Sequence, residues 1–185
     1  EAGAPVQVVL VNLQKGSNMV PSLQADLVDG IVMNQPVVAV AAHKKLGRVI
    51  ADLRDLPPKG KWANHPCCCV VASAEALAGK AEAVQALVQA ILAGGRFIAS
   101  DQEQAIRIAA AWTKKPLAVE QTSVPTVTYV SLPGKEWRRG MRTWFALMKD
   151  LGQFTKRLKD KTPEEMHALV SDYTLIEQAA EAVGE

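Results

Sequence analysis

The stretch Trp62-Ala-Asn-His-Pro-Cys-Cys-Cys-Val-Val-Ala-Ser73 decides the predicted fold class of this 185-residue chain. A polar loop that contains His65 runs directly into the apolar residues 67–72, and residues 75–99 then show helical spacing of their apolar side chains. This order predicts a loop, a short buried strand and a helix, with one imidazole at the mouth of the strand. Ligand sites in α/β proteins commonly lie at such junctions between loops and strands.

Before this stretch, predicted strands alternate with predicted helices. Strands are expected at 6–13, 31–33 and 48–53, where Val, Ile and Leu are dense, and helices are expected at 19–27 and 37–45. Strands that alternate with helices predict a parallel sheet.

After residue 73 the pattern is mostly helical. A capping box at Ser100-Asp-Gln-Glu103 predicts one helix start, and Thr162-Pro-Glu-Glu165 predicts another. Apolar stripes predict the buried faces of these helices and of two more, at 137–148 and 174–183. Residues 116–133 are expected to be irregular, with a short extended segment at 126–130.

Further expectations concern five single side chains in this helical part and before it. Met166, Leu169 and Val170 are expected to be buried, whereas His43 and His167 are expected at the surface of their helices.

Composition argues against a nucleic-acid partner and against a membrane span. The chain has 21 basic and 19 acidic residues, and no basic cluster is interleaved with aromatic residues, so no nucleic-acid partner is predicted. No run of about 18 uninterrupted apolar residues is present, so no membrane span is predicted either.

Three adjacent cysteines, Cys67 to Cys69, carry no predicted disulfide, because a bond between neighbours is strained. On a strand only Cys67 and Cys69 would share a face, and with His65 they would still lack a fourth ligand for a structural tetrahedral metal site. We therefore expect buried thiols that pack as small apolar side chains, without a metal or cofactor.

The order of these motifs resembles the solute-binding proteins of ABC transporters in the nitrate/sulfonate/taurine class, whose fold is shared by related pyrimidine-precursor proteins. The resembling stretches are Asn18-Met-Val-Pro-Ser-Leu-Gln-Ala25, Val28-Asp-Gly-Ile-Val-Met33, Asn34-Gln35-Pro36, Trp62-Ala-Asn-His-Pro-Cys-Cys68 and Ser171-Asp-Tyr-Thr-Leu-Ile176. Relatives commonly have Glu-Pro where this chain has Gln35-Pro36, so an amide here replaces a carboxylate.

The resemblance implies an α/β, type II-like periplasmic binding fold in which two lobes close over a solute. Residues 1–66 would form part of lobe two, residues 67–73 a crossover hinge strand, and residues 74–185 a mostly helical return to lobe one. Complete members of the class are longer, so we expect a longer parent, a companion chain or a homodimer to complete the cleft between the lobes.

Four residues are predicted to contact the ligand. Ser17 and Asn18 precede a helix whose free amide groups attract anions, and capping alone is the alternative. Gln35 lies at the carboxyl end of a predicted strand, and the alternative is a turn amide bonded to backbone. His65 belongs to the His-Pro motif that lies at the ligand in nitrate- and bicarbonate-type relatives, and its alternative is a histidine bonded within its own loop.

The resemblance implies a periplasmic solute-binding component of an ABC importer. It would capture a small organic or inorganic anion and deliver it to a permease, with no catalytic residues. An enzyme on the same fold is the alternative, either a pyrimidine-precursor synthase with a Cys/His iron site or a desulfinase-like hydrolase. A sensory domain that has lost solute binding is a third hypothesis.

Overall fold

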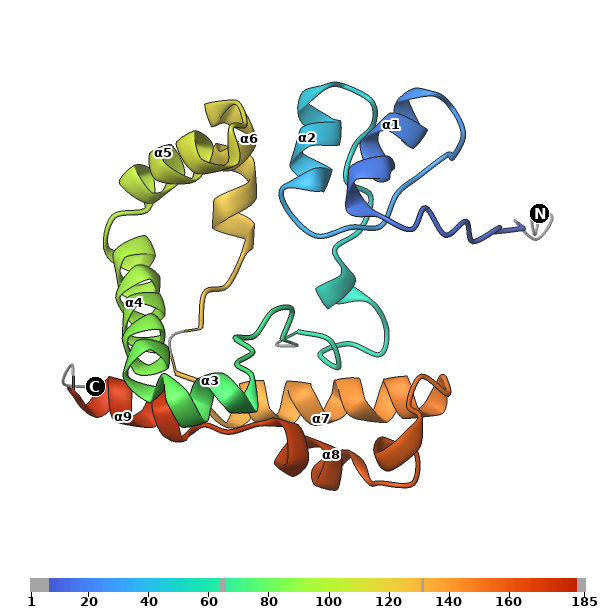
Figure 1. Cartoon of the computed structure of the whole chain (residues 1–185). Helices are drawn as coiled ribbons and strands as arrows, with labels where there is room; N and C mark the ends of the chain where they lie inside the picture. The colour runs from blue at the N-terminus through green and yellow to red at the C-terminus, as the bar shows by residue number, and fades with distance from the viewer. Residues whose placement is uncertain (1–6, 64–65, 131, 183–185) are drawn as a thin grey trace. The chain divides into compact units, whose positions relative to one another are not determined.

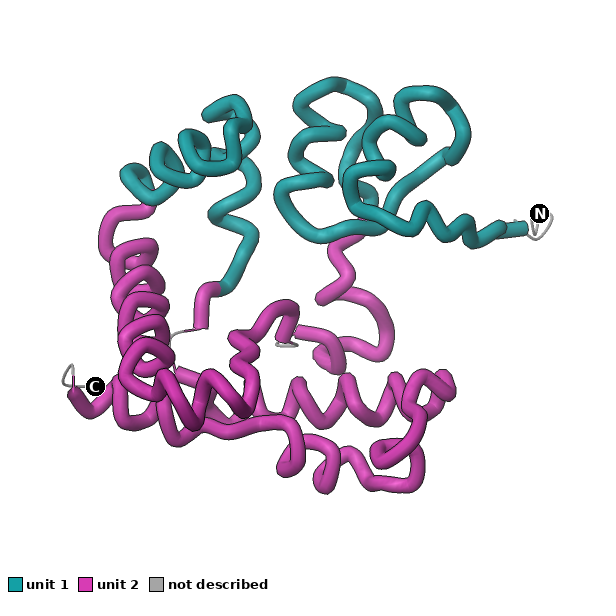
Figure 2. The backbone as a smooth tube through the Cα atoms, in the orientation of Figure 1, with its two compact units in different colours: residues 1–50, 103–128 teal, residues 51–102, 129–185 magenta. Residues whose placement is uncertain are grey.

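The computed structural model describes residues 7–63, 66–130 and 132–182 (Figure 1). Across these residues the regular structure is helical, and no β-strand is formed. The chain divides into two compact units (Figure 2). Unit 1 comprises residues 1–50 and 103–128, and unit 2 comprises residues 51–102 and 129–185. The three-part division into lobes and a hinge stays a prediction.

Unit 1 is built from short helices. They are η1 (Gly16–Asn18), α1 (Met19–Gln24), α2 (Val37–His43), α5 (Gln102–Thr113, whose first residue belongs to unit 2), α6 (Leu117–Ser123) and η3 (Val124–Thr126). Helix α2 contacts both α1 and α6. Its small residues Ala39 and Ala41 are buried, as is Val119 of α6, and alanine allows the helix backbones to approach closely. The buried carboxylate of Glu120 accepts a 2.7 Å hydrogen bond from the Thr113 hydroxyl, which satisfies its polar oxygen.

The predicted strands of unit 1 are extended but not paired. The described part of the first one, residues 7–13, exposes 93% of Leu10, and the segment at 47–52 exposes 88% of Ile50. The prediction that these residues form buried strands is therefore wrong for the described chain. A strand needs hydrogen bonds to a neighbouring strand, and no described segment supplies them here.

Unit 2 contains the longer helices. They are η2 (Leu53–Asp55), α3 (Ala74–Gly79), α4 (Ala81–Ser100), α7 (Lys135–Asp150), η4 (Lys156–Leu158), α8 (Pro163–Val170) and α9 (Thr174–Ala182). Helix α4 packs along α9, and α7 packs along α8. The core between α4 and α9 consists of Val88, Leu92, Ala179 and Ala180, because large side chains of α4 fit against small ones of α9.

Helix α4 is long and apolar enough to cross a membrane by length and composition, although the sequence analysis found no uninterrupted apolar run. Buried core helices pass the same test, but only 17% of the apolar stretch of α4 is buried. The buried residues Val88 and Leu92 pack against α9. The Gln85 amide also donates to the Leu175 carbonyl oxygen at 3.3 Å, which fixes the two helices in register.

The predicted helix at 75–99 is interrupted. Its first part is α3, which begins where the Ser73 hydroxyl accepts a hydrogen bond from the Ala76 amide. It ends at Gly79, and Lys80 leaves the helical conformation with φ −140° and ψ 36°. Gly79, which has a low helix propensity, is thus the last residue of α3. Ser100, predicted to cap α5, is instead the last residue of α4, and its hydroxyl donates to the Phe97 carbonyl oxygen.

The capping box before α8 is confirmed. The Thr162 hydroxyl accepts from the Glu165 amide, and the Glu165 carboxylate accepts from the Thr162 amide. Met166 is fully buried, as predicted, but Leu169 and Val170 are exposed. Helix α6 was not anticipated, since residues 116–133 were expected to be irregular.

Candidate functional site

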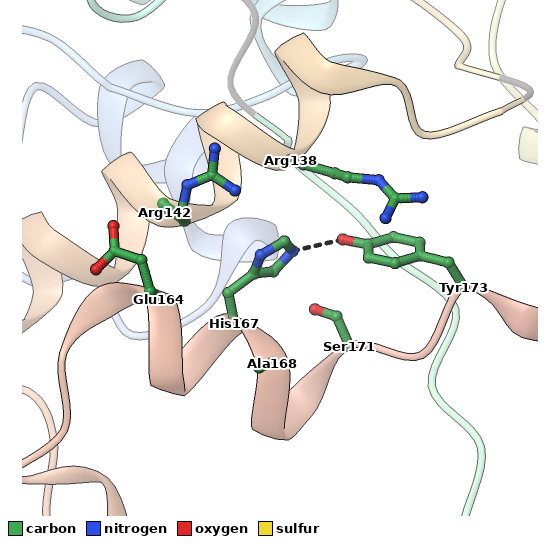
Figure 3. A pocket seen from close by; sticks show the side chains of 7 residues that line it. All are labelled: Arg138, Arg142, Glu164, His167, Ala168, Ser171 and Tyr173. Atoms are coloured by element: carbon green, nitrogen blue, oxygen red, sulfur yellow. Dashed lines mark hydrogen bonds between the residues drawn. The ribbon is translucent and has the colours of Figure 1, made fainter.

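Unit 2 contains a hollow between α7, α8 and the segment that leads into α9 (Figure 3). Its volume is about 310 Å³. Seven residues line it: Arg138, Arg142, Glu164, His167, Ala168, Ser171 and Tyr173. Six of these seven residues carry a polar or charged side chain.

Helical spacing brings these side chains together. Arg138 and Arg142 are four residues apart on α7, and residues four apart lie on the same face of a helix. Glu164, His167 and Ser171 follow the same rule on α8 and its C-terminal end. Because α7 packs on α8, residues from both faces line the hollow.

His167 is the buried centre of the site, with 9% of its surface exposed. Its Nε2 lies 2.6 Å from the Tyr173 hydroxyl oxygen, and its ring packs near Phe145 with centroids 6.4 Å apart. Burial lowers the pKa of the His167 imidazole, and the positive charges of Arg142 and Arg138 lower it further. The ring is therefore neutral at pH 7, with one nitrogen able to donate and the other able to accept.

Arg138 is held in place by several contacts. Its guanidinium carbon lies 3.9 Å from the centroid of the Tyr173 ring, and Nη2 is 2.6 Å from a Glu177 carboxylate oxygen. Its Nε donates to the Pro133 carbonyl oxygen at 3.1 Å. The edge of Trp137 contacts the same tyrosine ring, with centroids 5.9 Å apart. Tyr173 is thus fixed on its face, at its edge and at its hydroxyl.

Arg142 and Glu164 differ from Arg138 in their ion pairs. Among the ion pairs that the described residues form, none includes the guanidinium of Arg142 or the carboxylate of Glu164. Figure 3 shows Glu164 at one end of the hollow, with His167 between it and Tyr173. Both charged groups are therefore available to a molecule that enters.

Ser17 and Asn18, two of the predicted ligand residues, lie in η1 and are exposed. The Asn18 amide donates to the Leu13 carbonyl oxygen at 2.8 Å, and its side chain makes no capping hydrogen bond to α1. The capping alternative for Asn18 is therefore wrong, because its side chain bonds to the preceding extended segment.

Gln35 caps the next helix. Its side-chain oxygen accepts a 3.1 Å hydrogen bond from the Ala39 amide in the first turn of α2, which confirms an amide bonded to backbone. The Gln35 and Ser17 segments are held near each other, since an added Cβ on Gly16 would lie 2.9 Å from Met33 Cε. The structure thus brings η1 and the residues before Gln35 into contact.

His65 lies outside the described residues. The residue that follows it, Pro66, is held to α7 because the Trp144 indole donates to its carbonyl oxygen at 3.0 Å. The Trp62 indole donates to the Pro57 carbonyl oxygen at 3.1 Å, so this tryptophan anchors its own loop.

The cysteines contradict their predicted burial. Cys67, Cys68 and Cys69 are all exposed. The sulfur atoms of Cys67 and Cys68 lie 3.6 Å apart. The described part of the chain contains no group of three or more His, Cys, Asp or Glu side chains that could hold a metal ion.

The hollow was not predicted from the sequence, because His167 was expected at the surface of its helix. His43 is exposed as predicted, but His167 is buried by the contact of α8 with α7. The spacing of Glu164, His167 and Ser171 could have indicated the hollow, because it places three polar side chains on one face of the helix.

Comparison with known proteins places the chain among solute-binding proteins. Residues 3–114 match the NMT1-like family, and because this match covers more than half of the chain, the chain belongs to that family. The family is part of the nitrate/sulfonate/taurine-binding group of ABC solute-binding proteins. No curated protein and no solved structure matches the chain. The resemblance drawn from the motifs is thus confirmed at the level of the family, which suggests a periplasmic binding fold, although the described residues form no sheet.

Proposed function

We propose that this chain is the solute-binding component of an ABC importer and that it captures a small organic or inorganic anion. The family match carries this proposal, because residues 3–114 include all four predicted ligand residues, Ser17, Asn18, Gln35 and His65. Proteins of the family bind small solutes and work with ABC transporter permeases. The partners of this chain would then be an anionic solute and a permease, in the periplasm or another extracytoplasmic compartment.

The contacts around Gln35 support an anion of low charge. Its side-chain oxygen is engaged by the Ala39 amide, which leaves the amide nitrogen as the group that can donate to a ligand. The exposed Ser17 hydroxyl is a second donor, and the contact of Gly16 with Met33 keeps both segments together. An amide at this position also lacks the charge repulsion that a carboxylate would exert on an anion.

The sharpest test is Gln35→Glu. A glutamate can still accept the Ala39 amide hydrogen bond and preserve the start of α2, but it would repel a bound anion. We expect nitrate, taurine or a short sulfonate to raise the melting temperature of the parent chain, since a ligand that binds only the native state stabilises it. We expect the Gln35→Glu variant to keep its own melting temperature and lose this ligand-induced rise.

Gln24→Glu is the matched control, because it adds the same charge to an exposed position at the end of α1. It should retain the full ligand-induced rise. An equal rise in both variants would remove Gln35 from the ligand site. The absence of any rise with any of these anions in the parent chain would contradict anion capture.

An enzyme on the same fold is the competing hypothesis, and the exposure of Cys67 to Cys69 is the observation that favours it. Exposed thiols are accessible to a metal ion or a substrate from solution. Iron bound in stoichiometric amount by the purified chain would support the enzyme. Solute-induced stabilisation without turnover would support the binding protein.

Completion of the site by a companion chain or by a second copy is a further part of the proposal. Its basis is the exposure of apolar side chains such as Leu10 and Val71 on unpaired extended segments. Light scattering of the purified chain, with and without the solute, would measure this assembly. A dimer that forms only when solute is present would show that two copies of the chain share one solute site.

A further inference from the structure

We propose that the hollow between α7 and α8 is a second binding site, which takes a small oxyanion between the guanidinium groups of Arg138 and Arg142 and the hydroxyls of Ser171 and Tyr173. This site belongs to unit 2 and lies outside the residues matched to the family. It is therefore independent of the solute site proposed around Gln35.

The hollow has room for a small oxyanion together with water molecules. Its volume of about 310 Å³ is at the lower end of ligand pockets in proteins. Figure 3 shows both guanidinium groups on the α7 side, Ser171 on the α8 side, and the bonded pair of His167 and Tyr173 between them. An anion that enters would meet N–H donors from α7 and the hydroxyl groups of the segment between α8 and α9.

The two arginines provide the charge. Arg138 and Arg142 are like charges four residues apart on one helix, an arrangement that destabilises a helix by a few tenths of a kcal/mol. Glu177 compensates Arg138, whereas no ion pair of the described residues compensates Arg142. An oxyanion between the two guanidiniums removes their repulsion and can accept charge-assisted hydrogen bonds from both.

Arg138 is already held in position for this role. Its contacts with Glu177, Pro133 and the face of Tyr173 use Nη2 and Nε. A guanidinium has five N–H donors, so others remain for a ligand. Because these contacts fix the side chain before a ligand arrives, binding costs little of its conformational freedom.

The lowered pKa of His167 reflects in part the positive charges that line the hollow. The charges of Arg142 and Arg138 contribute to its lowered pKa, after burial. The groups that face it are these two arginines on α7, Glu164 on its own helix, and Tyr173 with Glu177 beyond it. A bound anion opposes the arginines, so binding raises the pKa of His167 and favours uptake of a proton by its ring.

Glu164 limits what the site accepts. It lies at the far end of the hollow in the first turn of α8, where the positive end of the helix dipole stabilises a carboxylate. Its presence is thus explained without a ligand. Its negative charge works against an anion and favours small ions that stay near Ser171 and Tyr173.

The test is titration of the full chain with inorganic phosphate, sulfate and acetate, at constant ionic strength in chloride. Isothermal titration calorimetry measures affinity, and NMR of the imidazole protons measures the pKa of His167. The chain has three histidines, so the His167 signal is identified by its loss in a His167→Gln variant. We expect at least one of these oxyanions to raise the pKa of His167.

Arg142→Gln and Arg139→Gln form the matched pair. Arg139 is on the same helix, but it is paired with Glu136 and does not line the hollow. Loss of a charge-assisted hydrogen bond of about 2 kcal/mol predicts a loss of affinity of more than about tenfold in Arg142→Gln. Arg139→Gln should stay within about twofold of the parent, and circular dichroism checks that both variants fold.

Glu164→Gln distinguishes the chemistry of the ligand. Removal of this carboxylate should tighten the binding of an oxyanion, whereas weaker binding would overturn the proposal by showing that Glu164 attracts the ligand. Equal affinities of the Arg142→Gln and Arg139→Gln variants would also overturn it, as would a pKa of His167 that none of the three anions changes. Preference for acetate would identify a carboxylate, and preference for phosphate or sulfate a tetrahedral oxyanion; either supports the site.

The failures of the two proposals are distinguishable. Gln35→Glu changes unit 1 alone and should leave the anion-induced change at His167 intact. Arg142→Gln should leave the stabilisation by the solute of the Gln35 site intact.

Discussion

The Nε2 atom of His167 lies 2.6 Å from the hydroxyl oxygen of Tyr173, and this contact joins the end of α8 to the start of α9. The tyrosine is also packed against Arg138 and Trp137 of α7. One hydrogen-bonded pair therefore connects three helices of unit 2. The stability of this unit and the properties of its hollow are coupled at these two residues.

Tyr173→Phe should remove the hydrogen bond and keep the ring contacts. A buried hydrogen bond of this kind contributes about 1 kcal/mol to the free energy of unfolding, so we expect a loss of that size. Urea denaturation measures it. Tyr173→Leu is the companion variant, and it should cost more because it also removes the contacts with Arg138 and Trp137. Unchanged stability of Tyr173→Phe would show that the hydroxyl makes no net contribution.

Stability should fall as the pH is lowered from 7 towards 5. The pKa of His167 is lowered in the folded chain by burial and by Arg142 and Arg138, while in the unfolded chain it is near 6.5. Between these two values the unfolded state binds more protons, so protonation favours unfolding. The contribution is complete above the unfolded pKa and is lost as the pH falls through the folded pKa.

Urea denaturation across this pH range, repeated with His167→Gln, checks the prediction. The variant should show a flatter dependence on pH between 7 and 5. His43→Gln is the control, because His43 is exposed, and it should follow the parent. An equal slope in the parent and in His167→Gln would contradict the assignment to His167.

The sequence predicted what local signals determine. The capping box at Thr162 and the helical spacing of the stripe around Phe145 involve residues within a few positions of each other, and both helices formed as expected. The bond of Gln35 to the Ala39 amide is also a local contact, and it matches the alternative to the predicted ligand role of Gln35. Such contacts can be read from spacing because they do not depend on the rest of the fold.

Contacts between distant parts of the chain could not be read in this way. The apolar runs that contain Leu10 and Ile50 have the composition of buried strands, but pairing depends on a second segment, and the described residues form no pair. The burial of His167 depends on the contact of α8 with α7, which no pattern within α8 reveals. The hollow was missed and the strands were wrongly predicted for the same reason, because both depend on contacts between segments that are distant in the sequence.

Gly16 and Met33 provide a test of the packing near Ser17 and Gln35. A Cβ on Gly16 would lie 2.9 Å from Met33 Cε, so a larger side chain there must displace the methionine. We expect Gly16→Ala to cost less than about 1 kcal/mol, because a methionine end is flexible, and Gly16→Val to cost about 1–3 kcal/mol.

Met33→Ala should recover part of the loss in the Gly16→Val variant. A double-mutant cycle by urea denaturation measures this coupling, which should exceed about 0.5 kcal/mol for residues in contact. The same cycle with Met148 of unit 2 in place of Met33 is the control. Additive effects of Gly16→Val and Met33→Ala would show that the two segments do not pack in solution.

The exposed cysteines lead to a prediction opposite to the one drawn from sequence. Cys69→Ala should change the free energy of unfolding by less than about 0.5 kcal/mol, as is usual for surface substitutions. A thiol reagent should modify all three cysteines of the folded chain. Cys68 should react most slowly, because its contact with the Cys67 sulfur and the charge of that neighbour raise the pKa of its thiol. Protection of all three thiols, together with a loss of more than about 2 kcal/mol in Cys69→Ala, would mean that residues 67–69 are covered in solution as a buried strand would be.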